Sequence, residues 1–198
     1  EDEIVVTDIE HHTFVTGLRT SGAKIKVARI QDAPVGGELE AIRKEVGPKT
    51  KLIGLSHVSW MDGRVLPLTE VSRLGPPVFV DGAQSVAAIP TDVTSLGCDF
   101  LTFPGQKWVL GPDATGGVFI REDWHDRLAV ALPSFYGHAP WRGQEIDTPL
   151  PGAQRYEATG IPLPMLSAMD AALSYATDLG QERFTYTAEL ARDTLAKL

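Results

Sequence analysis

Short apolar runs and helical patterns alternate along the first 120 residues of the chain. We expect strands at residues 4–6, 24–30, 51–58, 78–80, 99–103 and 117–120. Between them, apolar residues recur at helical spacing in 11–18, 38–46 and 68–74. Strands that alternate with helices indicate an α/β fold, in which helices cover both faces of a mainly parallel sheet. The expected architecture is therefore a three-layer sandwich around one sheet.

The pattern changes between residues 133 and 164, which contain six prolines and show little periodicity. Two helical patterns follow, at 165–179 and 181–198. We interpret the proline-rich stretch both as a substrate-facing loop and as a seam between domains. On this view residues 1–160 form a large domain, and 161–198 are connecting helices that lead into an incomplete small domain. The abrupt start and the end within a helix suggest a piece of a longer protein.

The composition narrows the class of protein. Of the 198 residues 43% are hydrophobic and 22% charged, which is enough apolar material for a buried core. A net charge of -8 without any basic run argues against nucleic-acid binding. Neither a membrane-spanning apolar stretch nor a secretory leader is visible, so we expect a cytoplasmic location without membrane contact. The single cysteine, Cys98, excludes an internal disulfide, and we expect a packed thiol rather than a nucleophile.

Two chemically useful residues follow expected strands. Lys107 stands just past the strand at 99–103, and Asp81 ends the strand at 78–80. Ligands of α/β proteins bind at these carboxyl ends of the strands. A lysine amine can form a Schiff base with the aldehyde of pyridoxal phosphate, and a carboxylate can keep the pyridine nitrogen protonated so that the ring withdraws electrons. The pair therefore predicts a pyridoxal phosphate site; the alternatives are a solvated lysine and a turn cap at Asp81.

Five segments resemble, in order, the motifs of the class V aminotransferase family. They are residues 7–12 (TDIEHH), 56–67 (SHVSWMDGRVLP), 80–85 (VDGAQS), 105–112 (GQKWVLGP) and 155–160 (RYEATG). The resemblance covers residues 1–180 and implies the large domain of a fold type I pyridoxal phosphate enzyme. The family includes cysteine desulfurases, selenocysteine lyases and isopenicillin N epimerase-like enzymes.

The resemblance also implies roles for individual residues. Lys107 would be the Schiff-base lysine, and Asp81 would pair with the pyridinium nitrogen. Gln84 matches the position that donates to the phenolic oxygen of the cofactor. His11 matches the histidine that stacks on the pyridine ring, with His12 as the alternative. We expect His11 and His12 to point in different directions and therefore expect no metal site.

Some positions depart from the family pattern. Pro104 and Gln106 stand where desulfurases have serine and histidine, so a phosphate-binding hydroxyl is lost while Gln106 keeps one hydrogen-bond donor. Thr159, shifted by one residue, would reach the cofactor phosphate of a neighbouring subunit or cap the following turn. Trp60 replaces an asparagine beside the cofactor and would reshape the substrate pocket. Trp108 is expected to pack under the loop that carries Lys107.

The resemblance implies an enzyme that acts on a small amino acid, as a homodimer with the active site at the subunit interface. Carbon–sulfur bond cleavage, as in a cysteine desulfurase or another C-S lyase, is the expected reaction, and it would bring a possible sulfur acceptor as partner. Transamination or epimerisation of an amino acid is the alternative. A second alternative is a degenerate or truncated scaffold without catalytic activity.

Overall fold

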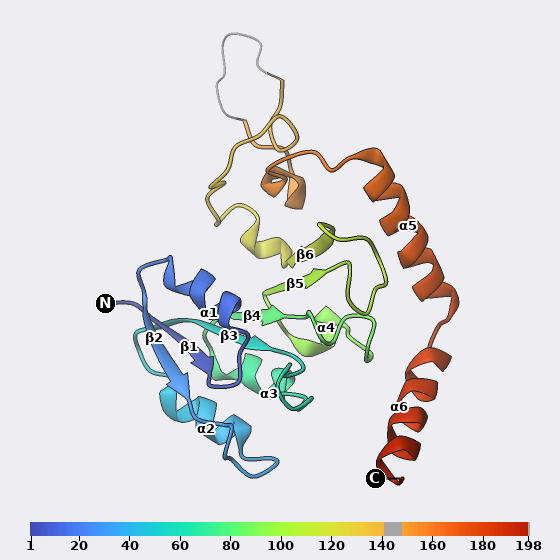
Figure 1. Cartoon of the computed structure of the whole chain (residues 1–198). Coiled ribbons are helices and arrows are strands. Elements are labelled where there is room, and N and C mark those ends of the chain that lie inside the picture. The colour runs from blue at the N-terminus through green and yellow to red at the C-terminus, as the bar shows by residue number, and fades with distance from the viewer. Residues whose placement is uncertain (141–147, 198) are drawn as a thin grey trace.

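The computed structural model of the chain describes residues 1–140 and 148–197 (Figure 1). Within these residues one sheet has six strands in the order β2-β1-β3-β4-β5-β6. The strands are β1 (Glu3–Thr7), β2 (Lys24–Ala28), β3 (Thr50–Ser56), β4 (Val78–Asp81), β5 (Phe100–Pro104) and β6 (Gly116–Ile120). Strands β1 to β5 are parallel, and β6 pairs antiparallel with β5 at one edge. The predicted mainly parallel sheet is confirmed.

The expected helices are all present, with ends that differ by a few residues. The helices are α1 (His12–Arg19), α2 (Glu38–Glu45), α3 (Leu68–Val71), α4 (Val93–Leu96), α5 (Leu163–Asp178) and α6 (Glu182–Leu195), with 3₁₀ turns η1 (Ser72–Leu74), η2 (Glu122–Trp124) and η3 (Gly152–Tyr156). Sequence periodicity missed α4, because four residues are too few to show a helical repeat. This short helix begins where Asp92 accepts the Thr94 amide (3.0 Å) and ends at the left-handed Gly97.

The strand expected at 24–30 ends early, at Ala28. The Ile30 amide donates to the Asp8 carboxylate (2.8 Å) instead of joining a neighbouring strand. Ile30 is nevertheless fully buried in the core. The apolar pattern in the sequence reflects burial and therefore continues to Ile30, although strand pairing stops at Ala28. This is why the expected strand is longer than β2.

Alternating side chains of the strands point to opposite faces of the sheet and bring helices to both. Ile4 and Val6 of β1 belong to a cluster with Leu18 of α1 on one face. Val5, between them, belongs to the larger cluster on the other face, which includes Ile42 of α2. Residues of α3 and α4 join that second cluster as well. The sheet therefore lies between α1 on one side and α2, α3 and α4 on the other, which confirms the three-layer α/β sandwich.

Helix α1 packs very closely over β3. A methyl group added at Gly54 of β3 would lie 2.7 Å from Cδ1 of Leu18. Real Cβ atoms do not approach other atoms this closely, so a larger residue at Gly54 would require the Leu18 side chain to shift. The Phe14 ring lies 3.4 Å from the same position, so α1 packs directly against β3 through two of its side chains.

Helices α5 and α6 follow one another along one side of the molecule (Figure 1). Met169 of α5 is buried, and its sulfur lies close to where Gly105 and Gly111, on the two sides of Lys107, would carry a Cβ. Among the described residues, no helix is both long and apolar enough to cross a membrane. The domain boundary expected at residue 160 stays a prediction.

Candidate active site

One pocket lies at the carboxyl ends of the parallel strands. It is lined by His11, Ser56, Val58, Trp60, Asp81, Ala83, Gln84 and Lys107. These residues follow or end β1, β3, β4 and β5. β2 lies on one side of β1, and β3 and the later strands lie on the other, so the strand order reverses at β1. In α/β proteins a crevice for ligands opens where the strand order reverses. Four of the residues expected at the site therefore meet in one place: Lys107, Asp81, Gln84 and His11.

Asp81 is held at the end of β4 through its backbone and one carboxylate oxygen. Its carbonyl accepts the His57 amide (3.0 Å), which continues the pairing with the neighbouring strand. Its Oδ1 accepts the Ala83 amide (2.9 Å) and caps the turn after the strand. The turn cap, which was one of the two alternatives for Asp81, is present, and the pairing with a pyridinium nitrogen stays a prediction. One carboxylate oxygen fixes the turn, and Asp81 still lines the pocket.

Lys107 lies in a tight loop after β5. The Gly111 amide donates to the Gly105 carbonyl (2.8 Å), and the Leu110 amide donates to the Lys107 carbonyl (3.0 Å). Leu110 has a φ of 64°, a left-handed conformation that a non-glycine residue adopts only where the surroundings require it. This closed loop holds a half-buried Lys107 beside the pocket.

His11 is the N-cap of α1, and its ring contacts two other aromatic rings. Its Nδ1 lies 2.7 Å from Thr13 Oγ1, which holds the imidazole at the helix start. The His12 ring stacks on it with a centroid separation of 4.5 Å, and the Trp60 indole meets it edge to face at 5.2 Å. The expectation that His11 and His12 point in different directions is wrong, because His11 has the extended backbone of an N-cap and its ring stacks on that of His12. Only His11 lines the pocket.

Gln84 and Trp108 are joined by a hydrogen bond. The Trp108 Nε1–H donates to Gln84 Oε1 over 2.8 Å. The indole is 44% exposed, so the expectation that it packs under the Lys107 loop is wrong. It reaches across to the loop after β4 instead.

A buried acidic residue beside the pocket was not expected from the sequence. Glu10 Oε2 accepts both the amide (2.8 Å) and the hydroxyl (2.6 Å) of Ser56, and Oε1 accepts the Thr7 hydroxyl (2.5 Å). Burial raises the pKa of Glu10, partly offset by these hydrogen bonds, and the nearby Asp81 charge raises it further. The only signal for it in the sequence was its position directly before His11, and the resemblance to the family assigned Glu10 no role.

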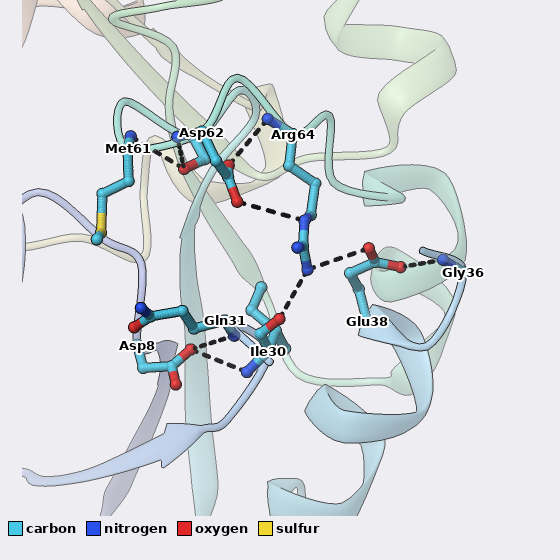
Figure 2. A network of polar contacts seen from close by, with 9 residues as sticks. Asp8, Ile30, Gln31, Gly36, Glu38, Met61, Asp62 and Arg64 are labelled. Atoms are coloured by element: carbon cyan, nitrogen blue, oxygen red, sulfur yellow. Dashed lines mark hydrogen bonds and ion pairs between the residues drawn. The ribbon is translucent and has the colours of Figure 1, made fainter. Parts of the chain in front are cut away.

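The loop that carries Trp60 is held by a polar network around Arg64. Figure 2 shows Arg64 between Glu38 and Asp62, with its Nη1 donating to the Ile30 carbonyl (2.7 Å). Nη1 lies 3.4 Å from Glu38 Oε1, and Nε lies 3.5 Å from Asp62 Oδ2. The network ties the segment 57–66 to the start of α2 and so fixes the indole at the pocket wall.

Two residues expected to bind the cofactor are not among those lining the pocket. Gln106 and Thr159 are both exposed, the first in the Lys107 loop and the second after η3. Their roles stay predictions. Within residues 1–140 and 148–197, no three His, Cys, Asp or Glu side chains are arranged to hold a metal ion. Residues 141–147 of the proline-rich stretch lie outside the described residues.

The chemistry of the lining residues fits pyridoxal phosphate. An amine, a carboxylate, an amide and an imidazole line one narrow pocket, in which only about 10 Å³ is open to a water molecule. The amine suits an aldehyde, the carboxylate a pyridinium nitrogen and the flat imidazole a ring face. The space is small, so the long side chain of Lys107 or the half-exposed Trp60 would turn aside to admit a ring, as side chains commonly do on binding.

Comparisons with known proteins agree with this arrangement. A cysteine desulfurase of Haloferax volcanii is 31% identical over 201 aligned positions, which cover 96% of this chain and 46% of that protein. The cystine C-S lyase C-DES, solved with its reaction product cysteine persulfide, is 29% identical with a TM-score of 0.84 and covers 93% of this chain and 52% of its own. A C-DES mutant with glycine covalently linked to its PLP cofactor is 28% identical, with a TM-score of 0.82 over the same shares of both chains.

The chain thus spans about half the length of the proteins it resembles. The model of the aminotransferase class-V family matches it from residue 1 to residue 198. With the sheet order, the lysine loop and the aspartate in place, this match over the whole length settles the family: the chain belongs to the class V aminotransferases.

Proposed function

We propose that the protein is a pyridoxal phosphate enzyme that cleaves the carbon–sulfur bond of a small amino acid. The observation that carries the proposal is the meeting of Lys107, Asp81, Gln84 and His11 in one pocket. The similarity to cysteine desulfurases and to a cystine C-S lyase supports cleavage of a sulfur substrate. Cysteine, cystine and related S-substituted amino acids are the substrate class.

The pocket residues would hold the cofactor from different sides. Lys107 would bind its aldehyde carbon covalently, and Asp81 would hold a proton on its ring nitrogen. Gln84 would donate to its phenolic oxygen, and His11 would lie against its ring. When bound, pyridoxal phosphate withdraws electrons from the substrate α-carbon and so weakens the bonds at that atom.

Lys107 is the pocket residue suited to proton transfer. Its side chain is half-buried and lines the pocket together with Asp81, Gln84 and His11. Lys107 Nζ would take the proton from the substrate α-carbon and return one later. Asp81, fixed by the Ala83 amide, would stay in place beside the ring nitrogen.

Product analysis of the intact protein tests the proposal. Supplied with pyridoxal phosphate, it should release sulfide or persulfide sulfur from cysteine or cystine. Alanine as the organic product would identify a desulfurase, which needs a sulfur acceptor, whereas pyruvate with ammonia would identify a C-S lyase. Release of no sulfur from any of these substrates would reject C-S cleavage.

Transamination or epimerisation is the second candidate, because the Trp60 indole lines the pocket. An indole is large and its nitrogen can only donate, so it would recognise substrates differently from an amide. Exchange of the substrate α-proton with deuterium from D₂O, without loss of sulfur, would select this candidate.

A non-catalytic scaffold is the remaining alternative. Borohydride reduction of the protein with pyridoxal phosphate should attach the cofactor to Lys107, which peptide mass analysis can locate, and Lys107→Ala should lose the label. Absence of any label on the intact protein would favour the scaffold. A homodimer with a shared active site, a sulfur acceptor and a cytoplasmic location stay predictions.

A further inference from the structure

We propose that Trp108 is a positioning residue that orients the Gln84 amide so that its nitrogen faces the cofactor. The inference rests on the proposed function, because it assigns Trp108 a task only when pyridoxal phosphate occupies the pocket. Trp108 itself does not line the pocket, whereas Gln84 does. Any effect of the indole on the cofactor would therefore pass through Gln84.

The hydrogen bond between the two side chains has only one possible direction. The indole nitrogen can donate but not accept, so the Gln84 atom 2.8 Å from Trp108 Nε1 must be the oxygen. A glutamine amide without such a partner can turn over and exchange its oxygen and nitrogen. With Oε1 committed to Trp108, the two N–H groups of Gln84 remain available to the pocket.

The two loops involved are also tied together through their backbones. Arg183 at the start of α6 donates from Nη2 to the Trp108 carbonyl (3.1 Å), and the same nitrogen donates to the Ala87 carbonyl. Ala87 follows Gln84 closely and has a left-handed φ of 68°. One guanidinium thus holds the loop after β4 next to the loop after β5, which keeps Gln84 within reach of the indole.

The orientation of the amide has a measurable consequence for a bound cofactor. A Gln84 N–H that donates to the phenolic oxygen of the cofactor would stabilise a negative charge on that oxygen. The cofactor would then lose the proton that this oxygen shares at a lower pH. An amide oxygen in the same place would repel that charge. Without Trp108 the bound cofactor should therefore keep its proton to higher pH.

The test is a double-mutant cycle read by absorption spectroscopy on the intact protein with pyridoxal phosphate. The variants are Trp108→Phe, which keeps an aromatic ring but loses the N–H, Gln84→Leu, and the two combined. The pH midpoint of the cofactor's visible absorption change should rise by about 1 pH unit in each single variant. In the Gln84→Leu background, Trp108→Phe should add nothing, because there is no amide left to orient.

Trp124→Phe is the matched control. Trp124 Nε1 also donates to a side-chain oxygen, Asp99 Oδ1 at 2.8 Å, but it lies outside the pocket. This variant should leave the midpoint unchanged, and circular dichroism should show that all four variants fold.

Each other outcome overturns the inference. An unchanged midpoint in Trp108→Phe, or a shift of equal size with and without Gln84, would mean that Trp108 does not act through the amide. An unchanged midpoint in Gln84→Leu would do the same without relying on the tryptophan variant. A wild-type protein without any cofactor absorption would instead reject the proposed function itself.

Discussion

Glu10 and Ser56 are joined by two hydrogen bonds to a single carboxylate oxygen. Glu10 Oε2 accepts the Ser56 amide and the Ser56 hydroxyl, at 2.8 and 2.6 Å. Glu10 follows β1, and Ser56 ends β3 and pairs in register with Asp81 of β4. This contact between two strand ends therefore supports the part of the sheet edge on which the pocket is built.

We predict that Glu10→Gln reduces the pH dependence of stability. Burial raises the Glu10 pKa above the usual 4.5, so the folded state binds this proton more tightly than the unfolded state. The corresponding stability is fully present below pH 4.5 and is lost as pH rises through the raised pKa. The free energy of unfolding of the wild type, relative to Glu10→Gln, should therefore fall as the pH rises above 4.5 and through the raised pKa of Glu10.

Urea denaturation at several pH values measures this difference. Glu189→Gln on the exposed surface of α6 is the control and should leave the pH profile unchanged. If Glu10→Gln and the wild type lose stability in parallel as pH rises, the raised pKa of Glu10 is wrong.

We predict that Arg64→Met destabilises the protein by about 2 to 3 kcal/mol. Glu38 is only 6% exposed, so loss of its cationic partner leaves a carboxylate that is largely withdrawn from water. The Ile30 carbonyl loses its donor as well (Figure 2). Thermal or urea unfolding measures the cost.

A surface pair provides the comparison for Arg64. Arg43 lies 3.6 Å from Glu40, and both side chains are well exposed, so Arg43→Met should cost less than about 1 kcal/mol. Adding Glu38→Gln to Arg64→Met should restore part of the stability, because it removes the uncompensated charge. If Arg64→Met and Arg43→Met lowered the free energy of unfolding equally, the network around Arg64 would not stabilise the protein more than a surface ion pair does.

We predict that Gly105→Ala destabilises the Lys107 loop by about 1 to 3 kcal/mol. The added methyl group would overlap Thr115 Oγ1 and lie 3.0 Å from the sulfur of Met169. Gly17→Ala in α1 is the matched control: nothing lies within 4 Å of its Cβ position, and it should stabilise by up to about 1 kcal/mol. Combining Gly105→Ala with Thr115→Ala should recover stability if overlap is the cause, and no recovery would point to a different one.

We predict that Cys98 resists thiol reagents while the protein is folded. The side chain is buried, and burial raises its pKa to about 11, so the reactive thiolate is scarce at neutral pH. Reaction with a chromogenic disulfide should be slow in buffer and become fast in denaturant. Rapid labelling of the folded protein would contradict the packed position, which the structure confirms for this residue.

Local patterns were sufficient to predict most secondary elements and the positions of the key groups along them. The apolar strand before Asp81 and the one before Lys107 placed both residues at strand ends, because burial of a parallel strand leaves a continuous apolar run. For the same reason the second strand was predicted to reach Ile30. This residue is buried, but its amide donates to Asp8 and not to a neighbouring strand. A pattern records burial, and burial alone does not distinguish a strand from a loop inside the core.

The sequence by itself determined the alternation of strands and helices, the family resemblance and the residue types at the strand ends. The tertiary structure alone decided which strands are neighbours, and hence that His11, Asp81 and Lys107 share one pocket. It also decided the partners of Glu10, Arg64 and Trp108. These contacts join residues distant in the chain, whose meeting depends on strand order and on packing across the whole core, which no local spacing records.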